Sequence, residues 1–221
     1  MNYGIERGLV MSKTLKKFFD NKFVCEIGCD NGEVLHGLTT HAKKAIGIEI
    51  NEGPYNEAKE LEYHCDTEIV YGDAIEFLKN NPEVTPDVFY FWSNYVKKIG
   101  GMQWWMERIL ELRGTTNPTI IINIDLRKSE GLMQLGSARE IQEIYGGDII
   151  LLSFTRNNTN IKDECGLLII QCDDLTINKN RAAPNWDMDT YYQRVDPFYL
   201  EWLTQLTHVD LDSILTDPSD L

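Results

Sequence analysis

The sequence lacks any apolar run that approaches the roughly 18 residues of a membrane-spanning helix. Its first residues lack the basic segment followed by an apolar one that marks a secretory signal. The five cysteines are an odd number, which favours reduced thiols over a disulfide framework. We therefore expect a cytoplasmic protein with no membrane partner. A chain of 221 residues is long enough to bury the core of one α/β domain.

Basic and imidazole side chains are scarce. The 21 lysines and arginines stand against 35 aspartates and glutamates, which gives a formal net charge of -14. Such a surface repels phosphate backbones, so the composition argues against duplex nucleic acid as a partner. The four histidines are scattered, and there is no HExxH motif, no CxxC pair and no carboxylate cluster with metal spacing. The sequence therefore predicts no metal site.

What the sequence does have is a glycine turn between two apolar runs. The first run begins at Phe23, and the turn that follows contains Gly28 and Gly32. A helix-compatible segment comes next, and the second apolar run ends in Glu49. This order predicts a strand, a turn, a helix and a strand, with a carboxylate about 20 residues beyond the turn, where a nucleoside ribose would lie.

The glycine spacing indicates which nucleotide would bind. A dinucleotide-binding turn has glycine at its first, third and sixth positions. Counted from Gly28, the third and sixth positions hold Asp30 and Glu33, whose carboxylates would face a pyrophosphate in a place that should attract anions. S-adenosylmethionine has no phosphate and carries a sulfonium and an ammonium group, which suit Glu26 and Asp30. The alternative is an α/β turn that needs small residues and binds nothing.

The segment from Glu26 to Gly32 resembles the first motif of class I S-adenosylmethionine-dependent methyltransferases, acid-x-Gly-x-x-x-Gly. The resemblance implies that Glu49 accepts hydrogen bonds from both ribose hydroxyls and that Asp73 accepts one from the adenine amine. Asp73 is also suited to cap the helix that follows it, and both roles are compatible. The implied cofactor-binding residues are Glu26, Gly28, Cys29, Asp30, Gly32, Glu49, Ile50, Asp73 and Ala74.

On the acceptor side the chain departs from one branch of that family. Amino-directed nucleic-acid methyltransferases carry Asp/Asn/Ser-Pro-Pro-Tyr/Phe/Trp after the fourth strand, whereas this chain has Ser93, Asn94 and Tyr95 without prolines. The segment either orients a nucleophile by hydrogen bonding or is a plain polar loop. By resemblance, the catalytic candidates are Tyr95, Asn94 and Asp125.

The resemblance implies an enzyme that transfers a methyl group to a small molecule or a protein side chain by in-line displacement. Two alternatives stay open: a noncatalytic S-adenosylmethionine-binding partner subunit, and an aminopropyl transferase that uses the decarboxylated cofactor. The identity of the acceptor and the formation of a homo-oligomer also stay open.

The patterns predict an α/β, Rossmann-like methyltransferase fold: a mostly parallel seven-stranded sheet with an antiparallel final strand pair and helices on both faces. The expected strands are Phe23–Ile27, Ala45–Ile50, Glu68–Tyr71, Asp87–Trp92, Thr119–Asp125, Ile149–Phe154 and Gly166–Cys172. The expected helices are Ile5–Phe19, Glu33–Thr40, Pro54–Glu62, Ala74–Asn80, Met102–Arg113 and Ser137–Tyr145. Residues 1–221 are expected to form one domain, with a leading helix (1–20), a core (20–175) and a C-terminal appendage (176–221).

Overall fold

The structure, a computed structural model, describes residues 3–92, 101–125, 138, 141–142, 145–156, 159–171 and 207–210. Its strands are β1 (Phe23–Ile27), β2 (Lys44–Glu49), β3 (Asp66–Tyr71), β4 (Val88–Trp92), β5 (Thr119–Asp125), β6 (Asp148–Arg156), β7 (Thr159–Gln171) and β8 (Thr207–Asp210). Its helices are α1 (Tyr3–Thr14), α2 (Lys16–Phe19), α3 (Glu33–Leu38), α4 (Glu52–Lys59), α5 (Ala74–Asn80) and α6 (Gly101–Arg113), followed by a short 3-10 helix, η2 (Gly114–Thr116). None of the described helices is long and apolar enough to cross a membrane.

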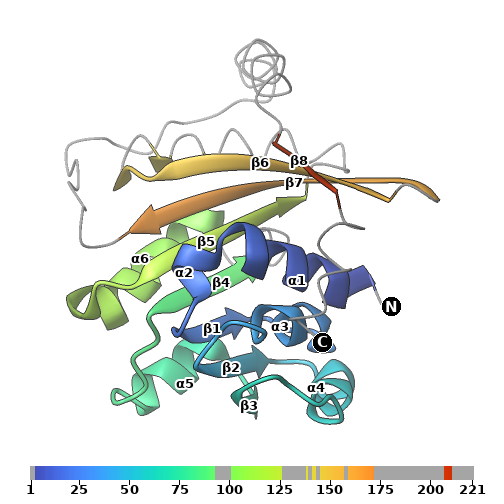
Figure 1. Cartoon of the computed structure of the whole chain (residues 1–221). Coiled ribbons are helices and arrows are strands. Elements are labelled where there is room, and N and C mark those ends of the chain that lie inside the picture. Colours follow the sequence, from blue (N-terminus) through green and yellow to red (C-terminus); the bar gives the residue numbers. More distant parts are fainter. Residues whose placement is uncertain are drawn as a thin grey trace.

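The described strands form one sheet in the order β3-β2-β1-β4-β5-β7-β6-β8 (Figure 1). Strands β1 to β5 pair in parallel, whereas β7 runs antiparallel to both β5 and β6. The predicted fold class is confirmed: the sheet is mostly parallel and contains the expected antiparallel pair, β6 and β7, which are the last two long strands in the described part of the chain. Because β1 to β5 are parallel, their carboxyl ends meet at one edge of the sheet, where ligands bind in open α/β folds.

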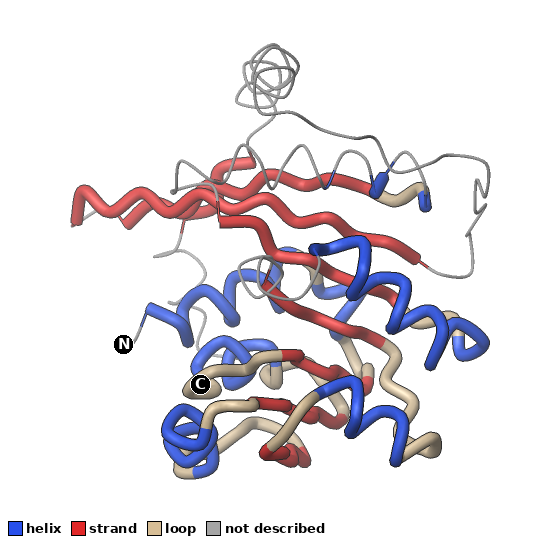
Figure 2. The backbone as a smooth tube through the Cα atoms, turned by 180° about the vertical axis from the view of Figure 1, so that it is seen from behind, coloured by secondary structure: helices blue, strands red, loops and turns tan. Residues whose placement is uncertain are grey.

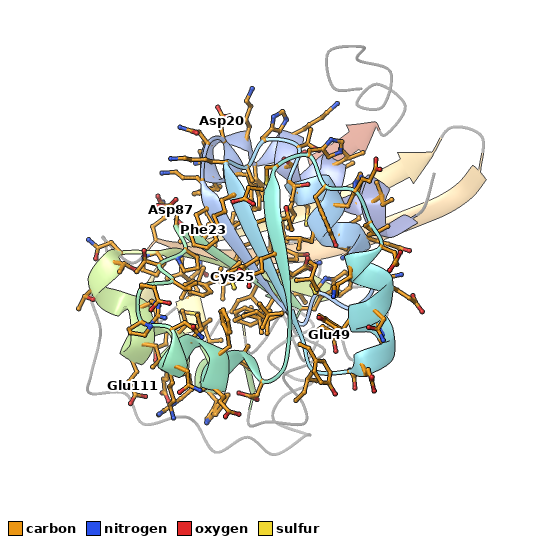
Figure 3. All side chains as sticks on the ribbon, turned by 90° about the horizontal axis from the view of Figure 1, so that it is seen from below. Asp20, Phe23, Cys25, Glu49, Asp87 and Glu111 are labelled. Atoms are coloured by element: carbon orange, nitrogen blue, oxygen red, sulfur yellow. The ribbon has the colours of Figure 1, made fainter. Side chains whose placement is uncertain are left out.

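Helices cover both faces of the sheet. One face packs against α1, α2 and α3 through a cluster that includes Met11, Phe19 and Tyr90. The other face packs against α5 and α6 through a cluster that includes Leu78 and Met106. Figure 3 shows the sheet edge-on between these two layers, and Figure 2 gives the view from behind. The continuous apolar strands predicted this arrangement, because a strand covered on both faces has no solvent side.

The leading helix differs from its prediction at one residue. Instead of one helix over Ile5–Phe19, the chain forms α1 and α2 with a break at Leu15, whose φ and ψ are -107° and 30°. Phe18 and Phe19 are both buried. Both rings belong to the apolar cluster on this face of the sheet, so the short helix α2 is held by its contact with the core.

The C-terminal half of the sheet is longer than predicted. The sequence predicts two strands, Ile149–Phe154 and Gly166–Cys172, with a polar connection between them, yet β6 continues to Arg156 and β7 begins at Thr159. The strand β8 was not predicted at all; it adds to the sheet in parallel beside residues 152–155 of β6. The predicted helix Ser137–Tyr145 lies mostly outside the described residues, but residues 138, 141, 142 and 145 are helical.

Candidate functional site

The glycine turn between β1 and α3 is held in a left-handed conformation. The φ angles are 68° at Gly28, 50° at Asp30 and 79° at Gly32. The backbone N–H groups of Gly28 and Cys29 donate to the carbonyl oxygen of Ile48, at 2.8 and 3.2 Å, which ties the turn to β2. A Cβ at Gly32 would collide with the Tyr63 hydroxyl. Position 32 therefore requires glycine for two reasons: its φ is positive, and the Tyr63 hydroxyl leaves no room for a side chain.

Glu49 ends β2 and connects it to the turn. Its Oε2 accepts from the Asp30 N–H at 3.0 Å, and its Oε1 accepts from the Asn51 N–H and Nδ2, each at 2.7 Å. Figure 3 shows Glu49 at the opposite end of the strands from Phe23 and Asp87. A carboxylate has about four acceptor positions, and three are used here. That Glu49 also accepts from a ribose stays a prediction.

Glu26 is buried at the base of the turn with only 1% of its surface exposed. The Leu35 backbone N–H donates to its carboxyl group, but Oε2 has no hydrogen-bond partner among the described residues. Burial, and then the nearby carboxylates of Asp30 and Glu49, raise the pKa of Glu26 well above its usual range. Burial and neighbouring carboxylates also raise the pKa of Asp30. These groups form an acidic region that suits a cation.

A cavity of about 310 Å³ opens beside this acidic region. Glu26, Asp30 and Glu33 supply carboxyl groups to its wall, and the backbone of Gly28 contributes as well. Arg7 of α1, which lines the same cavity, brings a cation. The cavity therefore carries both signs of charge on its wall.

A second, smaller cavity of about 60 Å³ lies on the other side of Gly28. It is lined by Ile50, Asp73, Ala74 and Trp105 together with neighbouring apolar residues. Asp73 also caps α5, because its side chain accepts from the Glu76 N–H at 2.9 Å. Gly28 lines both cavities, so a single ligand that reaches both would cross the glycine turn.

The structure brings the predicted cofactor residues together around these two cavities. Glu26, Gly28, Cys29 and Asp30 line the larger one, and Ile50, Asp73 and Ala74 line the smaller one. Gly32 and Glu49 shape the turn between them.

The predicted acceptor residues cannot be placed in the same way. Asn94 and Tyr95 lie outside the described residues, and Asp125 is described only as the last backbone position of β5. No group of three or more His, Cys, Asp or Glu side chains within the described ranges has a geometry that would hold a metal ion.

Several residues that line the cavities are not among the predicted site residues, and the largest of their side chains are those of Arg7, Trp92 and Trp105. The sequence pattern places Trp105 on an apolar helix, and it does belong to the apolar cluster under α6, although it also reaches the smaller cavity. The only sequence signal for Arg7 is a basic residue between Gly4 and Gly8 within an apolar helical pattern.

The sequence matches no protein-family model and no curated protein. In three dimensions the chain is similar to many solved structures of S-adenosylmethionine-dependent methyltransferases. An O-methyltransferase from Bacillus cereus in complex with SAH is 14% identical, with a TM-score of 0.51 over 74% of this chain and 80% of that chain. A methyltransferase from Thiobacillus denitrificans in complex with S-adenosyl-L-homocysteine is 16% identical, with a TM-score of 0.50 over 65% and 66%.

The similarity also reaches a protein whose name gives another reaction. A precorrin 8W decarboxylase from Methanobacterium thermoautotrophicum is 17% identical, with a TM-score of 0.50 over 74% of this chain and 88% of that chain. At these identities the likeness establishes architecture and leaves the reaction to the site. The chain has the fold of the class I S-adenosylmethionine-dependent methyltransferases.

Proposed function

We propose that this protein binds S-adenosylmethionine and transfers its methyl group to a small molecule or a protein side chain. The observation that carries the proposal is the Glu26 carboxyl group. It is buried, its Oε2 has no partner among the described residues, and it lines a cavity beside the glycine turn of a class I methyltransferase fold. A buried carboxyl group without a full set of partners is costly, and a cationic ligand would offset that cost.

The residues present fit the two ends of this cofactor. Its ammonium and sulfonium groups suit the acidic region formed by Glu26 and Asp30. Its adenine suits the smaller cavity, where Ile50 and Ala74 offer apolar contact and Asp73 offers an acceptor. The backbone of Gly28 lies between the two cavities, without a side chain to obstruct a ligand that spans them.

S-adenosylmethionine supplies a methyl group on a sulfonium sulfur, which is a good neutral leaving group. The protein must then mainly hold the acceptor in line with that methyl group and exclude water, and positioning of this kind accounts for a large share of many barriers. Tyr95, Asn94 and Asp125 remain the proposed acceptor-side residues because they follow β4 and end β5. The net charge of -14 favours a neutral or cationic acceptor.

Titration calorimetry with S-adenosylmethionine, S-adenosylhomocysteine and NAD tests the cofactor proposal. We expect the first two to bind and NAD not to bind. Binding of NAD without binding of S-adenosylmethionine would overturn the proposal.

Turnover is tested separately, by following S-adenosylhomocysteine formation with small amines, phenols, carboxylates and basic peptides as acceptors. Cofactor binding without turnover on any acceptor would favour the noncatalytic partner subunit. Turnover with decarboxylated S-adenosylmethionine alone, followed as release of 5′-methylthioadenosine, would favour an aminopropyl transferase.

A further inference from the structure

Arg7 is a buried cation on the wall of the larger cavity, with only 2% of its surface exposed. Its Nη2 donates to the Asn123 Oδ1 at 3.1 Å, and its Cζ lies 4.1 Å from the centroid of the Trp92 ring. Asn123 in turn donates from Nδ2 to the Tyr90 hydroxyl at 2.7 Å. These contacts with β4 and β5 fix the orientation of the guanidinium group, so Arg7 is a positioned side chain and not a solvated one.

Close packing between α1 and α3 also determines where Arg7 lies relative to the cavity. A Cβ at Gly8 of α1 would collide with the carbonyl oxygen of Val34 in α3, and a Cβ at Gly37 of α3 would collide with the backbone of α1. The backbones of the two helices are therefore in direct contact. This contact places Arg7, the residue before Gly8, at the wall of the cavity. A long, charged side chain is rarely buried unless it is paired, and the contacts with Asn123 and Trp92 hold Arg7 on the wall of the cavity.

Glu26 and Asp30 line the same cavity and supply the opposite charge. The groups that act on the pKa of Glu26 are the carboxylates of Asp30 and Glu49 and the Leu35 N–H. The wall of the cavity therefore presents carboxyl groups and one guanidinium group to the same ligand. A ligand group that carries an ammonium and a carboxylate on one carbon atom, an α-amino acid group, matches that arrangement.

We infer that Arg7 forms a carboxylate-binding subsite for the amino-acid end of S-adenosylmethionine, while Glu26 receives the ammonium group. The inference rests on the proposed function. A guanidinium has five N–H donors in a planar fork, so its contact with Asn123 is compatible with a two-bond contact to a carboxylate. The subsite distinguishes two of the open functions, because an aminopropyl transferase uses a cofactor that has lost this carboxylate.

The decisive measurement compares two ligands on the wild-type protein by titration calorimetry. S-adenosylmethionine carries a net charge of +1, and its decarboxylated form carries +2. An acidic cavity without the Arg7 subsite would bind the decarboxylated form at least as tightly. With the subsite, S-adenosylmethionine should bind roughly 10- to 100-fold more tightly, because charge-assisted hydrogen bonds are lost with the carboxylate.

Two substitutions assign that preference to a residue. Arg7→Met keeps the apolar stem and should abolish the preference. Arg113→Met is the matched control, because Arg113 is also buried. Its guanidinium donates to the carbonyl oxygens of Leu78, Asn81 and Val84, which precede β4, whereas Trp92 is the last residue of β4. The control should lower the melting temperature and keep the preference. If Arg7→Met does not fold, Arg7→Lys keeps the charge without the planar fork and should reduce the preference.

The outcomes separate the inference from the proposed function. Three outcomes would overturn the subsite while leaving cofactor binding intact. The first is equal affinity of the wild-type protein for both ligands. The others are a preference that survives in folded Arg7→Met or Arg7→Lys and a preference that is lost in Arg113→Met. Binding of free L-methionine as tightly as S-adenosylmethionine would assign the subsite to a free amino acid and overturn the cofactor assignment. Absence of binding by both adenosyl ligands would remove the proposed function, and the subsite with it.

Discussion

At the scale of single residues, Glu26 couples the site to pH. Its pKa is raised in the folded protein above an ordinary value near 4.5, mainly by burial. The folded state therefore holds a proton more tightly than the unfolded state, and this group destabilises the fold progressively as pH rises from about 4.5 toward the folded pKa. A bound cation favours the ionised form, so ligand affinity should rise over the same interval.

We expect Glu26→Gln to melt at a higher temperature than the wild-type protein at pH 8 without ligand, by the equivalent of about 1–3 kcal/mol, and to match it near pH 4.5. Thermal melts across that range check the sign. S-adenosylmethionine affinity should increase with pH in the wild-type protein and stay nearly constant in Glu26→Gln. The exposed Glu68 of β3 offers a control, because Glu68→Gln should change neither curve. A wild-type melting temperature that rises with pH relative to Glu26→Gln would contradict this account.

Glu49 has two roles that one substitution can separate. Glu49→Ala leaves the N–H groups of Asp30 and Asn51 without their acceptor. It should therefore cost about 1–3 kcal/mol of stability and weaken S-adenosylmethionine binding roughly 10- to 100-fold. The exposed Glu52, three residues further on, is the matched control, and Glu52→Ala should retain full affinity. Unchanged affinity in folded Glu49→Ala would remove Glu49 from the site.

The spacing of glycines and acids in the sequence was enough to predict which residues meet around the turn, because Glu26, Gly28 and Gly32 are local to one another and Glu49 follows by a short crossover. Arg7 was not predictable in this way. Its burial depends on the distance between α1 and α3 and on Trp92 and Asn123, which are 85 and more residues away along the chain. A helical pattern predicts an apolar stripe but does not show that an arginine beside it faces a cavity.

At the scale of elements, the contact between α1 and α3 determines how the larger cavity is closed. Gly37→Ala would push a methyl group against the backbone of α1 at Ile5, Gly8 and Leu9. Neither helix backbone can yield easily, so we expect a loss of about 1–3 kcal/mol and weaker cofactor binding. Gly53→Ala in α4 is the control, since a Cβ there meets nothing within 4 Å. It should be neutral or gain up to about 1 kcal/mol from helix propensity. Chemical denaturation of the two variants measures both effects; equal stability would contradict the packing argument.

The elements that the sequence predicted well are those with continuous apolar runs. The strands β1 and β5 and the helix α5 have the predicted limits. The ends of β6 and β7 extend through polar residues because each strand needs only its hairpin partner for backbone hydrogen bonds. The four residues of β8 join the sheet beside β6, more than 50 positions away along the chain. A strand that short carries no periodic signal of its own, so only tertiary pairing reveals it.

At the scale of the whole molecule, the proposed cofactor residues and the proposed acceptor residues follow different strands at the same edge of the sheet. The carboxyl ends of β1, β2 and β3 lead into the glycine turn, Glu49 and Asp73, which make up the proposed cofactor side. The ends of β4 and β5 lead to Tyr95 and Asp125 on the proposed acceptor side. Helix α1 lies over one face and brings Arg7 to the same edge (Figure 1). The described residues that line the two cavities all lie between Gly4 and Trp105.

The net charge of -14 determines which macromolecules can approach this edge. Association with duplex DNA requires cations that neutralise phosphates and release counterions. The basic cluster at the start of the chain consists of Lys13, Lys16 and Lys17, of which Lys16 and Lys17 are exposed on α2. Two or three lysines on an acidic protein supply few phosphate contacts. We therefore propose that the acceptor is a small molecule or a protein side chain and that duplex DNA is not bound.

Fluorescence anisotropy with a labelled random DNA duplex tests this expectation. The salt concentration is varied from about 50 to about 200 mM, a range over which binding through phosphate contacts weakens strongly. We expect no saturable binding at micromolar protein at any of these salt concentrations. Binding that is tight at low salt and falls steeply as salt rises would contradict the proposal, because that slope counts neutralised phosphates. A Lys16→Glu and Lys17→Glu double variant would then show whether α2 is the source. If binding persisted in that variant, the cations would lie elsewhere, and nucleic acid would return as a candidate acceptor for the methyl group.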